Sequence, residues 1–155
     1  MKCELRAIKK EDETFLFEVY VSTRRQEVES WGWSPQQIHT FLSMQWQTQQ
    51  HSYRQQFPNA NHYLILYEND YAGRCIIEDL PRHLHLIDLS ILPGFQGKRI
   101  GTFIIELLQQ KASKKEKPLM LQVFHENSAM LLYEKLGFRV VEDHGLYVRM
   151  QWQKI

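Results

Sequence analysis

Hydrophobic and polar residues follow each other along this chain with two different periods. Stretches that alternate, or that are continuously apolar over a few residues, are typical of β-strands. They occur at residues 3–8, 63–67, 71–79, 83–92, 119–124, 138–142 and 146–152. Stretches in which apolar residues recur every three or four positions are typical of amphipathic helices. They follow residues 12, 34 and 98, with a shorter one after 127. The pattern predicts a mixed α/β fold of about seven strands and about four helices.

The first two helices have recognisable starts and inner faces. Lys9–Glu13 places acidic residues at the positive end of the first helix dipole, and Ser34 with Pro35 suits the cap and first position of the second helix. We expect the first helix to pack through Phe15, Leu16, Val19 and Tyr20. For the second helix we expect an inner stripe of Ile38, Phe41, Leu42, Gln45, Trp46, Gln49 and Tyr53.

The junction after the strand at 83–92 is the most informative stretch of the chain. A short turn with glycines at 94 and 97 carries Lys98 and Arg99 and leads into a helix. One face of that helix is predicted to consist of Ile100, Phe103, Ile104, Leu107, Leu108 and Ala112. We expect the amides of Gln96 to Thr102 to form its free first turn. Such amides and the positive dipole end bind anions, so this junction is predicted to hold phosphate.

A second motif decides between a phosphate site and a simple turn. Asn127 to Phe138 reads NSAMLLYEKLGF, a short helix with Asn127 or Ser128 as its cap and Gly137 as its stop. Together with ILPGFQGKRIG at 91–101 it resembles the acetyl-CoA signature of the GNAT superfamily of N-acetyltransferases. That signature runs in outline Val-x-Pro-x-Tyr-Gln/Arg-Gly-x-Gly-x-Gly, then Asn-x-x-Ala-x-x-Leu-Tyr-x-Lys-x-Gly-Phe, and the alanine here stands two positions after Asn127.

The resemblance implies a single GNAT domain over residues 1–155. Its mostly antiparallel sheet would splay between the fourth and fifth strands, and acetyl-CoA would enter the splay. The pantetheine arm would pair with exposed backbone groups of Ile91 and Leu92. The residues implied around the pyrophosphate are Gln96, Gly97, Lys98, Ile100, Gly101 and Thr102, and Asn127 would contact the pantetheine or the pyrophosphate.

The chain departs from the signature at Arg99, where the family usually has its second glycine. The side chain of Arg99 either crowds the phosphates or pairs with them bidentately. We favour the pairing.

The chemistry that the resemblance implies is direct attack of an amine on the thioester, without an acyl-enzyme. Tyr133 matches the family's tyrosine at the CoA sulfur, although a tyrosine that merely packs beside its neighbours remains an alternative. The sequence leaves the general base open. Asp88 and His85 are level candidates and Glu78 follows them, while each taken alone is more often structural than catalytic.

The acceptor of the acetyl group is not identified by the sequence. The first two helices and their loop usually select it in this fold, and here they carry Tyr20, Trp31, Trp33, Trp46 and Tyr53. These rings either form a cation–π box for an ammonium group or belong to the core. No large acidic patch is present, so a polyamine or histone-tail acceptor is not indicated. A small-molecule amine is favoured over a protein.

Composition excludes several other classes. With 155 residues, 43% hydrophobic residues and a formal net charge of +1, the chain is typical of a globular domain without a general field for nucleic acid or membranes. No apolar run predicts a signal peptide or a membrane span, so a cytoplasmic location is expected. Cys3 and Cys75 are expected to be buried thiols, and no histidine cluster has metal-ligand spacing. A homodimer is possible by analogy only.

Two alternative functions stay open at this point. One is a non-catalytic GNAT-like module that binds acyl-CoA as a regulator or scaffold, for which Arg99 is the main support. The other is a protein that holds a different phosphorylated ligand at the same helix end.

Overall fold

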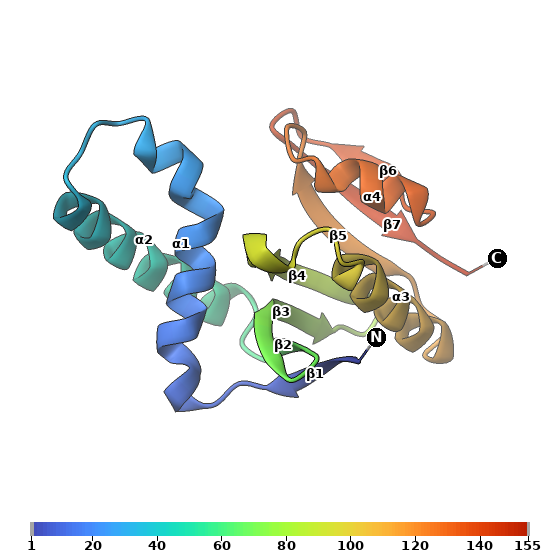
Figure 1. Ribbon diagram of the computed structural model, residues 1–155. Helices are drawn as coiled ribbons and strands as arrows, with labels where there is room; N and C mark the ends of the chain where they lie inside the picture. Colours follow the sequence, from blue (N-terminus) through green and yellow to red (C-terminus); the bar gives the residue numbers. More distant parts are fainter. Residues whose placement is uncertain (1, 155) are drawn as a thin grey trace. The chain divides into compact units, whose positions relative to one another are not determined.

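The computed structural model describes residues 2–154 and confirms the mixed α/β prediction (Figure 1). Within that part of the chain, seven strands hydrogen-bond as one sheet in the order β1-β2-β3-β4-β5-β7-β6. The strands are β1 Cys3–Ala7, β2 Asn61–Tyr67, β3 Asp70–Asp79, β4 Leu84–Ile91, β5 Leu119–Phe124, β6 Arg139–Asp143 and β7 Tyr147–Trp152. The helices are α1 Glu13–Glu29, α2 Pro35–Gln56, α3 Ile100–Lys114 and α4 Ala129–Lys135.

The described residues form two compact units. The first comprises residues up to 75 together with 90–96, and the second comprises 76–89 and the chain from 97 onward. Strands β3 and β4 therefore contribute residues to both units.

In the first unit, α1 and α2 form a helical hairpin that connects β1 and β2, in the chain order β1-α1-α2-β2, and these two strands pair antiparallel. The cap predicted at Ser34 is confirmed. The Ser34 hydroxyl accepts the Gln37 N–H at 3.2 Å, and the Ser34 N–H donates to Gln37 Oε1 at 2.9 Å. This reciprocal capping box satisfies two donors at the start of α2, with Pro35 as the first helical residue.

The two helices pack through a small apolar cluster. Its buried members are Tyr20, Val28 and Leu42, and Phe17, Val21, Ile38, Phe41 and Trp46 pack against it. The stripe predicted for α2 is thus correct in direction but less buried than expected. Leu42 is its one buried residue within the described chain, and Gln45 is exposed. A polar side chain at the margin of an amphipathic helix gains more from solvent than from a partial contact.

In the second unit, β4 and β5 pair in parallel across the α3 crossover. The ladder joins Leu84 to Leu119 and continues to Leu86 and Leu121. Both strands extend beyond it, and β5 goes on to pair with β7 as far as Phe124. The splay between the fourth and fifth strands is therefore confirmed, and it begins after Leu86.

Helix α3 packs on β5 through a face slightly rotated from the predicted one. Its buried residues are Ile100, Ile104, Ile105, Leu108 and Ala112. Leu107, predicted to be inside, is 38% exposed, whereas Ile105 is completely buried. In a run of adjacent apolar residues the helical period alone does not choose between neighbouring faces, and the packing against the sheet makes that choice.

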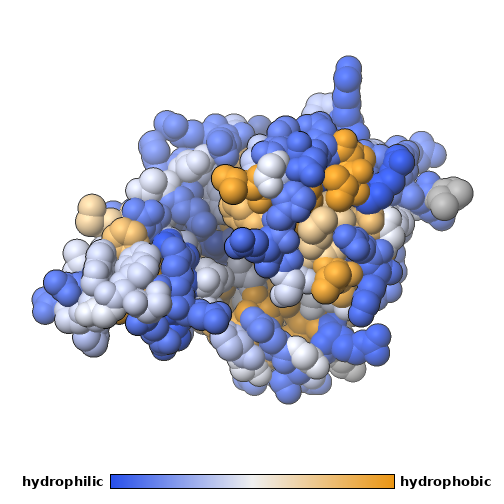
Figure 2. Space-filling model, turned by 90° about the horizontal axis from the view of Figure 1, so that it is seen from above, coloured by the Kyte–Doolittle hydropathy of each residue, from blue (hydrophilic) through white to orange (hydrophobic). Residues whose placement is uncertain are grey.

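The face seen in Figure 2 is largely hydrophilic, and its hydrophobic atoms lie in separate groups. Such scattered apolar residues are normal on a folded protein. Cys3 and Cys75 are buried, as expected. No helix in residues 2–154 has both the length and the apolar character needed to cross a bilayer.

Gly73 in β3 permits a close backbone contact within the first unit. A Cβ atom at this position would lie 2.1 Å from the Ser90 carbonyl oxygen and 3.0 Å from Ile91 Cα. Any side chain would therefore push β3 away from the end of β4, the segment that the GNAT resemblance assigns to the cofactor. An isolated glycine inside a strand pattern is the signal for such a contact.

We expect Gly73→Ala to lower the free energy of unfolding by roughly 1–3 kcal/mol or more, because the added methyl group overlaps backbone atoms that cannot rotate away. Gly94→Ala is the matched control, since its Cβ would meet nothing within 4 Å. Urea unfolding followed by tryptophan fluorescence measures both. Equal stability of the two variants would show that β3 does not depend on this contact.

Candidate active site

The turn before α3 uses some of its backbone amides internally. Pro93–Phe95 form one turn of 3₁₀ helix, in which the Phe95 N–H donates to Leu92 O at 2.9 Å. The Gln96 N–H donates to Pro93 O at 3.2 Å. The prediction of free amides from Gln96 onward is therefore wrong at Gln96, because the proline-led turn closes on itself and takes up that donor.

The chain then takes the left-handed conformation twice before the helix begins. Gly97 has φ +79°, and Arg99, the residue that precedes α3, has φ +67° and ψ +18°. The first helical hydrogen bond runs from the Phe103 N–H to Arg99 O at 3.0 Å. The amides of Ile100, Gly101 and Thr102 lie ahead of it, so they have no intrahelical acceptor. Ile100 itself is 1% exposed, which anchors this end of α3 in the core.

The conformation of Arg99 explains why a glycine suits this position. The left-handed region costs a residue with a β-carbon about 1–2 kcal/mol, and glycine almost nothing. The family's second glycine thus has a backbone reason in addition to small size. Lys98 and Arg99 are both exposed, so two cationic side chains flank three amides at the positive end of a helix.

The expected backbone contacts at the end of β4 are only partly available. The Leu92 N–H donates to Ala72 O at 2.9 Å in the first unit. The prediction that Leu92 exposes its N–H is therefore wrong, because the sheet already uses this donor. The Ile91 carbonyl accepts the side-chain Nε2–H of Gln96 at 3.0 Å, an exposed contact that a ligand can displace.

The second motif forms α4 as expected. Asn127 Oδ1 accepts the Ala129 N–H at 2.9 Å, so Asn127 supplies the side-chain cap and leaves its amide nitrogen as a donor. Gly137 ends the helix with φ +95°. Tyr133 is 8% exposed, and its ring centroid lies 5.7 Å from that of Phe138. Packing against Phe138 therefore holds the Tyr133 ring in place.

The three base candidates occupy different environments in the second unit. His85 on β4 is 8% exposed, and burial lowers its pKa from 6.5 to about 4, with smaller contributions from His83 and Arg149. Asp88 is half-buried and lies beyond the β4–β5 ladder, while Glu78 on β3 is buried. Regular strand alternation places His85 and Asp88 on opposite faces of β4, so the two cannot serve one acceptor together.

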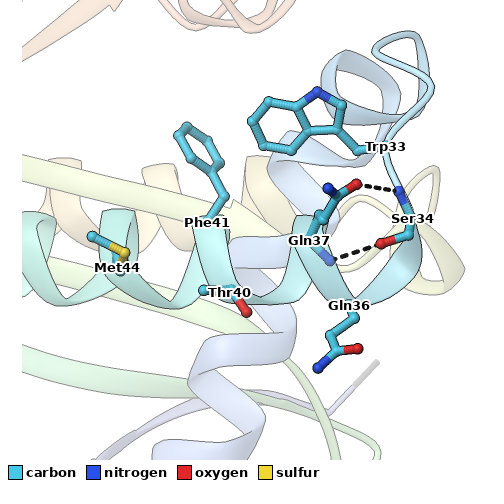
Figure 3. Close-up of a pocket in the computed structure, with 7 residues that line it drawn as sticks. All are labelled: Trp33, Ser34, Gln36, Gln37, Thr40, Phe41 and Met44. Atoms are coloured by element: carbon cyan, nitrogen blue, oxygen red, sulfur yellow. Dashed lines mark hydrogen bonds between the residues drawn. The ribbon is translucent and has the colours of Figure 1, made fainter.

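The helical hairpin of the first unit carries an open pocket of about 660 Å³ (Figure 3). Its lining residues are Trp33, Ser34, Gln36, Gln37, Thr40, Phe41 and Met44, none of which is charged. Trp31 and Trp33 are 37% and 43% exposed, and their ring centroids lie 5.0 Å apart. The loop tryptophans are therefore accessible, as the cation–π interpretation requires, although they also pack on each other.

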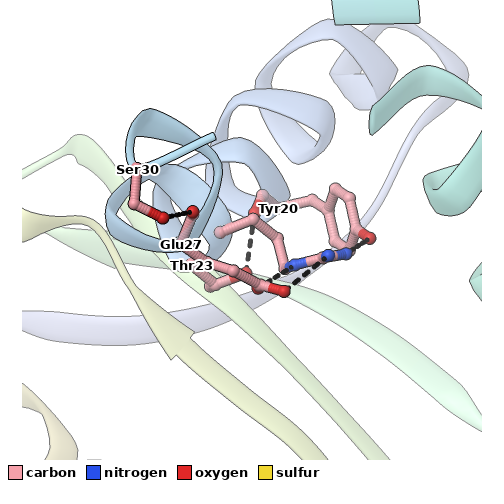
Figure 4. Close-up of polar contacts among 5 residues, drawn as sticks. Tyr20, Thr23, Glu27 and Ser30 are labelled. Carbon is pink, nitrogen blue, oxygen red and sulfur yellow. Dashed lines mark hydrogen bonds and ion pairs between the residues drawn. The ribbon is translucent and has the colours of Figure 1, made fainter. Parts of the chain in front are cut away.

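Polar contacts hold the end of α1 that leads into this loop. Figure 4 shows Tyr20, Thr23, Glu27 and Ser30. The Thr23 hydroxyl donates to Tyr20 O at 2.6 Å, and the Ser30 hydroxyl donates to Glu27 O at 2.7 Å. Arg24 donates to Glu27 at 2.7 Å and to the Tyr20 hydroxyl at 2.7 Å, and the hydrogen bond to Glu27 lowers the pKa of that carboxyl group. This guanidinium makes three hydrogen bonds, two to Glu27 and one to Tyr20.

Sequence reasoning missed one cationic residue in the second unit. Arg149 on β7 contributes to the lowered pKa values of both His83 and His85, after burial as the larger cause. The only signal in the sequence is the interruption of an apolar strand by one arginine. Within residues 2–154, no three or more His, Cys, Asp or Glu side chains gather as a possible metal site.

Comparison with known proteins places the chain in a family. The family model described as acetyltransferase (GNAT) family matches residues 25–138. The chain therefore belongs to the GNAT acetyltransferases, a family of acyltransferases.

Individual relatives agree with that family. The [ribosomal protein bS18]-alanine N-acetyltransferase of Haemophilus influenzae is 33% identical over 84 residues, which span 54% of this chain and 58% of that protein. The PaiA N-acetyltransferase of Thermoplasma acidophilum, solved in complex with coenzyme A, aligns with a TM-score of 0.73 at 19% identity over 99% and 100% of the two chains. The ribosomal-protein-S18-alanine N-acetyltransferase of Escherichia coli aligns with a TM-score of 0.63 at 18% identity over 98% and 94%.

We expect His85 to make the protein sensitive to mild acid. The unfolded imidazole takes up a proton near pH 6.5 but the folded one only near pH 4, so stability falls as the pH drops through this window. The maximum loss is about 3 kcal/mol. Unfolding free energies of the wild type and His85→Gln between pH 7.5 and 4 test this expectation: the stability of the variant should fall less. If the unfolding free energies of the wild type and the variant fell equally with pH, His85 would not be a neutral buried imidazole in the folded protein.

Proposed function

We propose that the protein transfers an acetyl group from acetyl-CoA to a primary amine by direct attack of the amine on the thioester. One observation carries the proposal: three amides without intrahelical acceptors begin α3, next to two exposed cations, in a member of the GNAT family. No finding favours the non-catalytic alternative.

The residues of the second unit fit the diphosphate of coenzyme A. The amides of Ile100, Gly101 and Thr102 supply charge-assisted donors, and Lys98 and Arg99 supply positive charge. The Asn127 side chain retains two N–H donors after capping α4. Acetyl-CoA supplies the acetyl group already activated as a thioester. The contacts proposed for Ile91 require the Gln96 side chain to leave the Ile91 carbonyl.

Tyr133 is proposed to donate a hydrogen bond to the departing sulfur. Burial and the contact with Phe138 fix its ring. A phenol with a pKa near 10 loses its proton to a thiolate with a pKa near 8.5 at a cost of about 2 kcal/mol in water. Hydrogen bonding to the developing charge is therefore the more important contribution.

The amine must reach the thioester without its extra proton. Holding an alkylammonium in its neutral form at pH 7 costs roughly 4–5 kcal/mol for a pKa near 10.4. Among the candidates, Asp88 is proposed first because it lies beyond the end of the β4–β5 ladder. The pKa of about 4 makes His85 a weak proton acceptor, and Glu78 remains the third candidate.

The acceptor is proposed to be a small amine, and a protein amine is the alternative acceptor that the experiment must compare with it. The H. influenzae relative acts on an alanine of a ribosomal protein, and the chain spans little more than half of that relative. The uncharged pocket at Trp33 and Phe41 suits an apolar part of an acceptor, while its rings also allow a cation–π contact worth about 0.5–2 kcal/mol.

The proposed function predicts CoA thiol release when enzyme, acetyl-CoA and a suitable amine are mixed. We expect Tyr133→Phe to lower kcat about 100-fold, because the hydrogen bond acts on the developing thiolate. Its Kd for acetyl-CoA should stay within about twofold, since that bond is made mainly in the transition state. Tyr63→Phe on β2 is the matched control and should retain activity.

The class of acceptor is tested with a panel of small amines and an N-terminal peptide. For each compound, thiol release is measured and the product is identified by mass spectrometry. Acetyl-CoA binding without transfer to any amine would refute the catalytic proposal. Unchanged kcat in Tyr133→Phe would remove Tyr133 from the mechanism.

Arg99 is proposed to bind phosphate although its left-handed backbone conformation is strained. Two variants separate the contribution to CoA binding from the cost in stability. Arg99→Gly should raise the free energy of unfolding by about 1 kcal/mol, whereas Arg99→Ala should leave it nearly unchanged. Both should weaken CoA binding roughly tenfold through the lost charge-assisted bonds. Denaturation and calorimetric titration provide the two readouts. Tighter binding by either variant would show that the guanidinium obstructs the cofactor.

A further inference from the structure

Arg149 occupies a special place in the sheet of the second unit. On β7 it lies directly across from Gln122 of β5 and, on its other side, from Glu142 of β6. Gln122 is the first residue of β5 beyond the β4–β5 ladder, which ends at Leu121. Because neighbouring strands are about 4.8 Å apart, Arg149 stands one strand from the point where β4 and β5 separate.

The guanidinium of Arg149 is poorly satisfied. Its Nη1 donates to Glu142 Oε1 at 3.4 Å, close to the limit for a hydrogen bond. Its Nε is buried and has no hydrogen-bond acceptor among residues 2–154. Arg24 differs in having two bonds to Glu27 and one to Tyr20. A guanidinium has five N–H donors, so Arg149 retains most of its capacity to bind an anion.

Arg149 forms an ion pair with Glu142, whose Oε1 lies 3.4 Å from Nη1, and that carboxylate is shared with His144. His83 and His85 are near enough for its charge to help lower their pKa values, after burial as the larger cause. With a pKa of about 4, the His85 imidazole is uncharged at neutral pH. Glu142 is about half exposed and also accepts from His144 Nε2 at 2.9 Å. The side chain of Arg149 is 28% exposed, which leaves it accessible from solvent.

We infer that Arg149 binds a carboxylate group of the acceptor, so that the natural substrate is a small amine that also carries a carboxylate. This inference rests on the proposed function and specifies its substrate class. The planar fork of arginine binds a carboxylate through two parallel hydrogen bonds. Arg149 lies one strand away from the point where β4 and β5 separate, which is the opening that acetyl-CoA is proposed to enter.

Matched pairs of acceptors test the inference directly. L-alanine, β-alanine and L-lysine are compared with their carboxamides, which keep the size and the amine but lose the negative charge. In the wild type, kcat/KM should be at least tenfold higher for the acids. The amine of each carboxamide is less basic and hence more available at neutral pH, so a preference for the acid cannot come from the amine.

Variants at Arg149 assign the preference to this side chain. Arg149→Gln should reduce the acid-to-amide ratio to about one, mainly through a higher KM for the acid. Arg149→Lys, which keeps the charge without the fork, should retain part of the ratio and serves if Arg149→Gln folds poorly. Lys114→Gln, at the end of α3, removes one exposed positive charge and should leave the ratio unchanged. A wild-type preference for the amides, or an acid preference that survives Arg149→Gln, would overturn the inference.

A binding measurement keeps the inference independent of turnover. The protein saturated with CoA is titrated with β-alanine and with β-alaninamide while the Nε–H resonance of Arg149 is followed by NMR. A saturable shift with the acid alone supports the carboxylate site, and no shift with either contradicts it. Absence of acetyl transfer to every amine, together with a shift for the acid, would refute the proposed function and retain the carboxylate site.

Discussion

The arrangement of the candidate site depends on a short backbone path that turns left-handed at Gly97 and again at Arg99. This path ends the preceding turn and starts α3 at Ile100, whose buried side chain anchors the helix. Three amides consequently stand ahead of the first helical hydrogen bond, where the helix dipole adds positive potential. If the chain entered the helix by another route, the exposed lysine and arginine alone would form only a weak, screened anion site.

The second unit contains both the start of α3 and the opening between β4 and β5. Amides at the start of α3 are proposed to bind the charged end of the cofactor, and the splay after Leu86 opens the sheet beside Asp88. Tyr133 is held by its ring on α4, and Arg149 lies across from the first residue past the splay. The proposed chemistry therefore relies more on positioning than on a reactive side chain, which agrees with transfer without an acyl-enzyme.

Much of the fold could be predicted from the sequence because strand and helix periods differ clearly. The cap at Ser34, the stop at Gly137 and the turn before α3 also follow from local chemistry. Three details could not be predicted, since each depends on a partner remote in the chain or on a choice between close alternatives. The Leu92 amide is used by Ala72, Gly73 faces Ser90, and α3 buries Ile105 instead of Leu107. Arg149 gains its significance only from the register that places it opposite Gln122 and near His85.

The most direct test of this account is a ¹⁵N-resolved NMR titration of the protein with coenzyme A. Backbone amides that donate to phosphate oxygens shift strongly downfield. The account predicts that the largest amide proton shifts belong to Ile100, Gly101 and Thr102, with a much smaller shift at Gln96, whose N–H is already bonded to Pro93. Saturable binding that leaves the three α3 amides unshifted would contradict it.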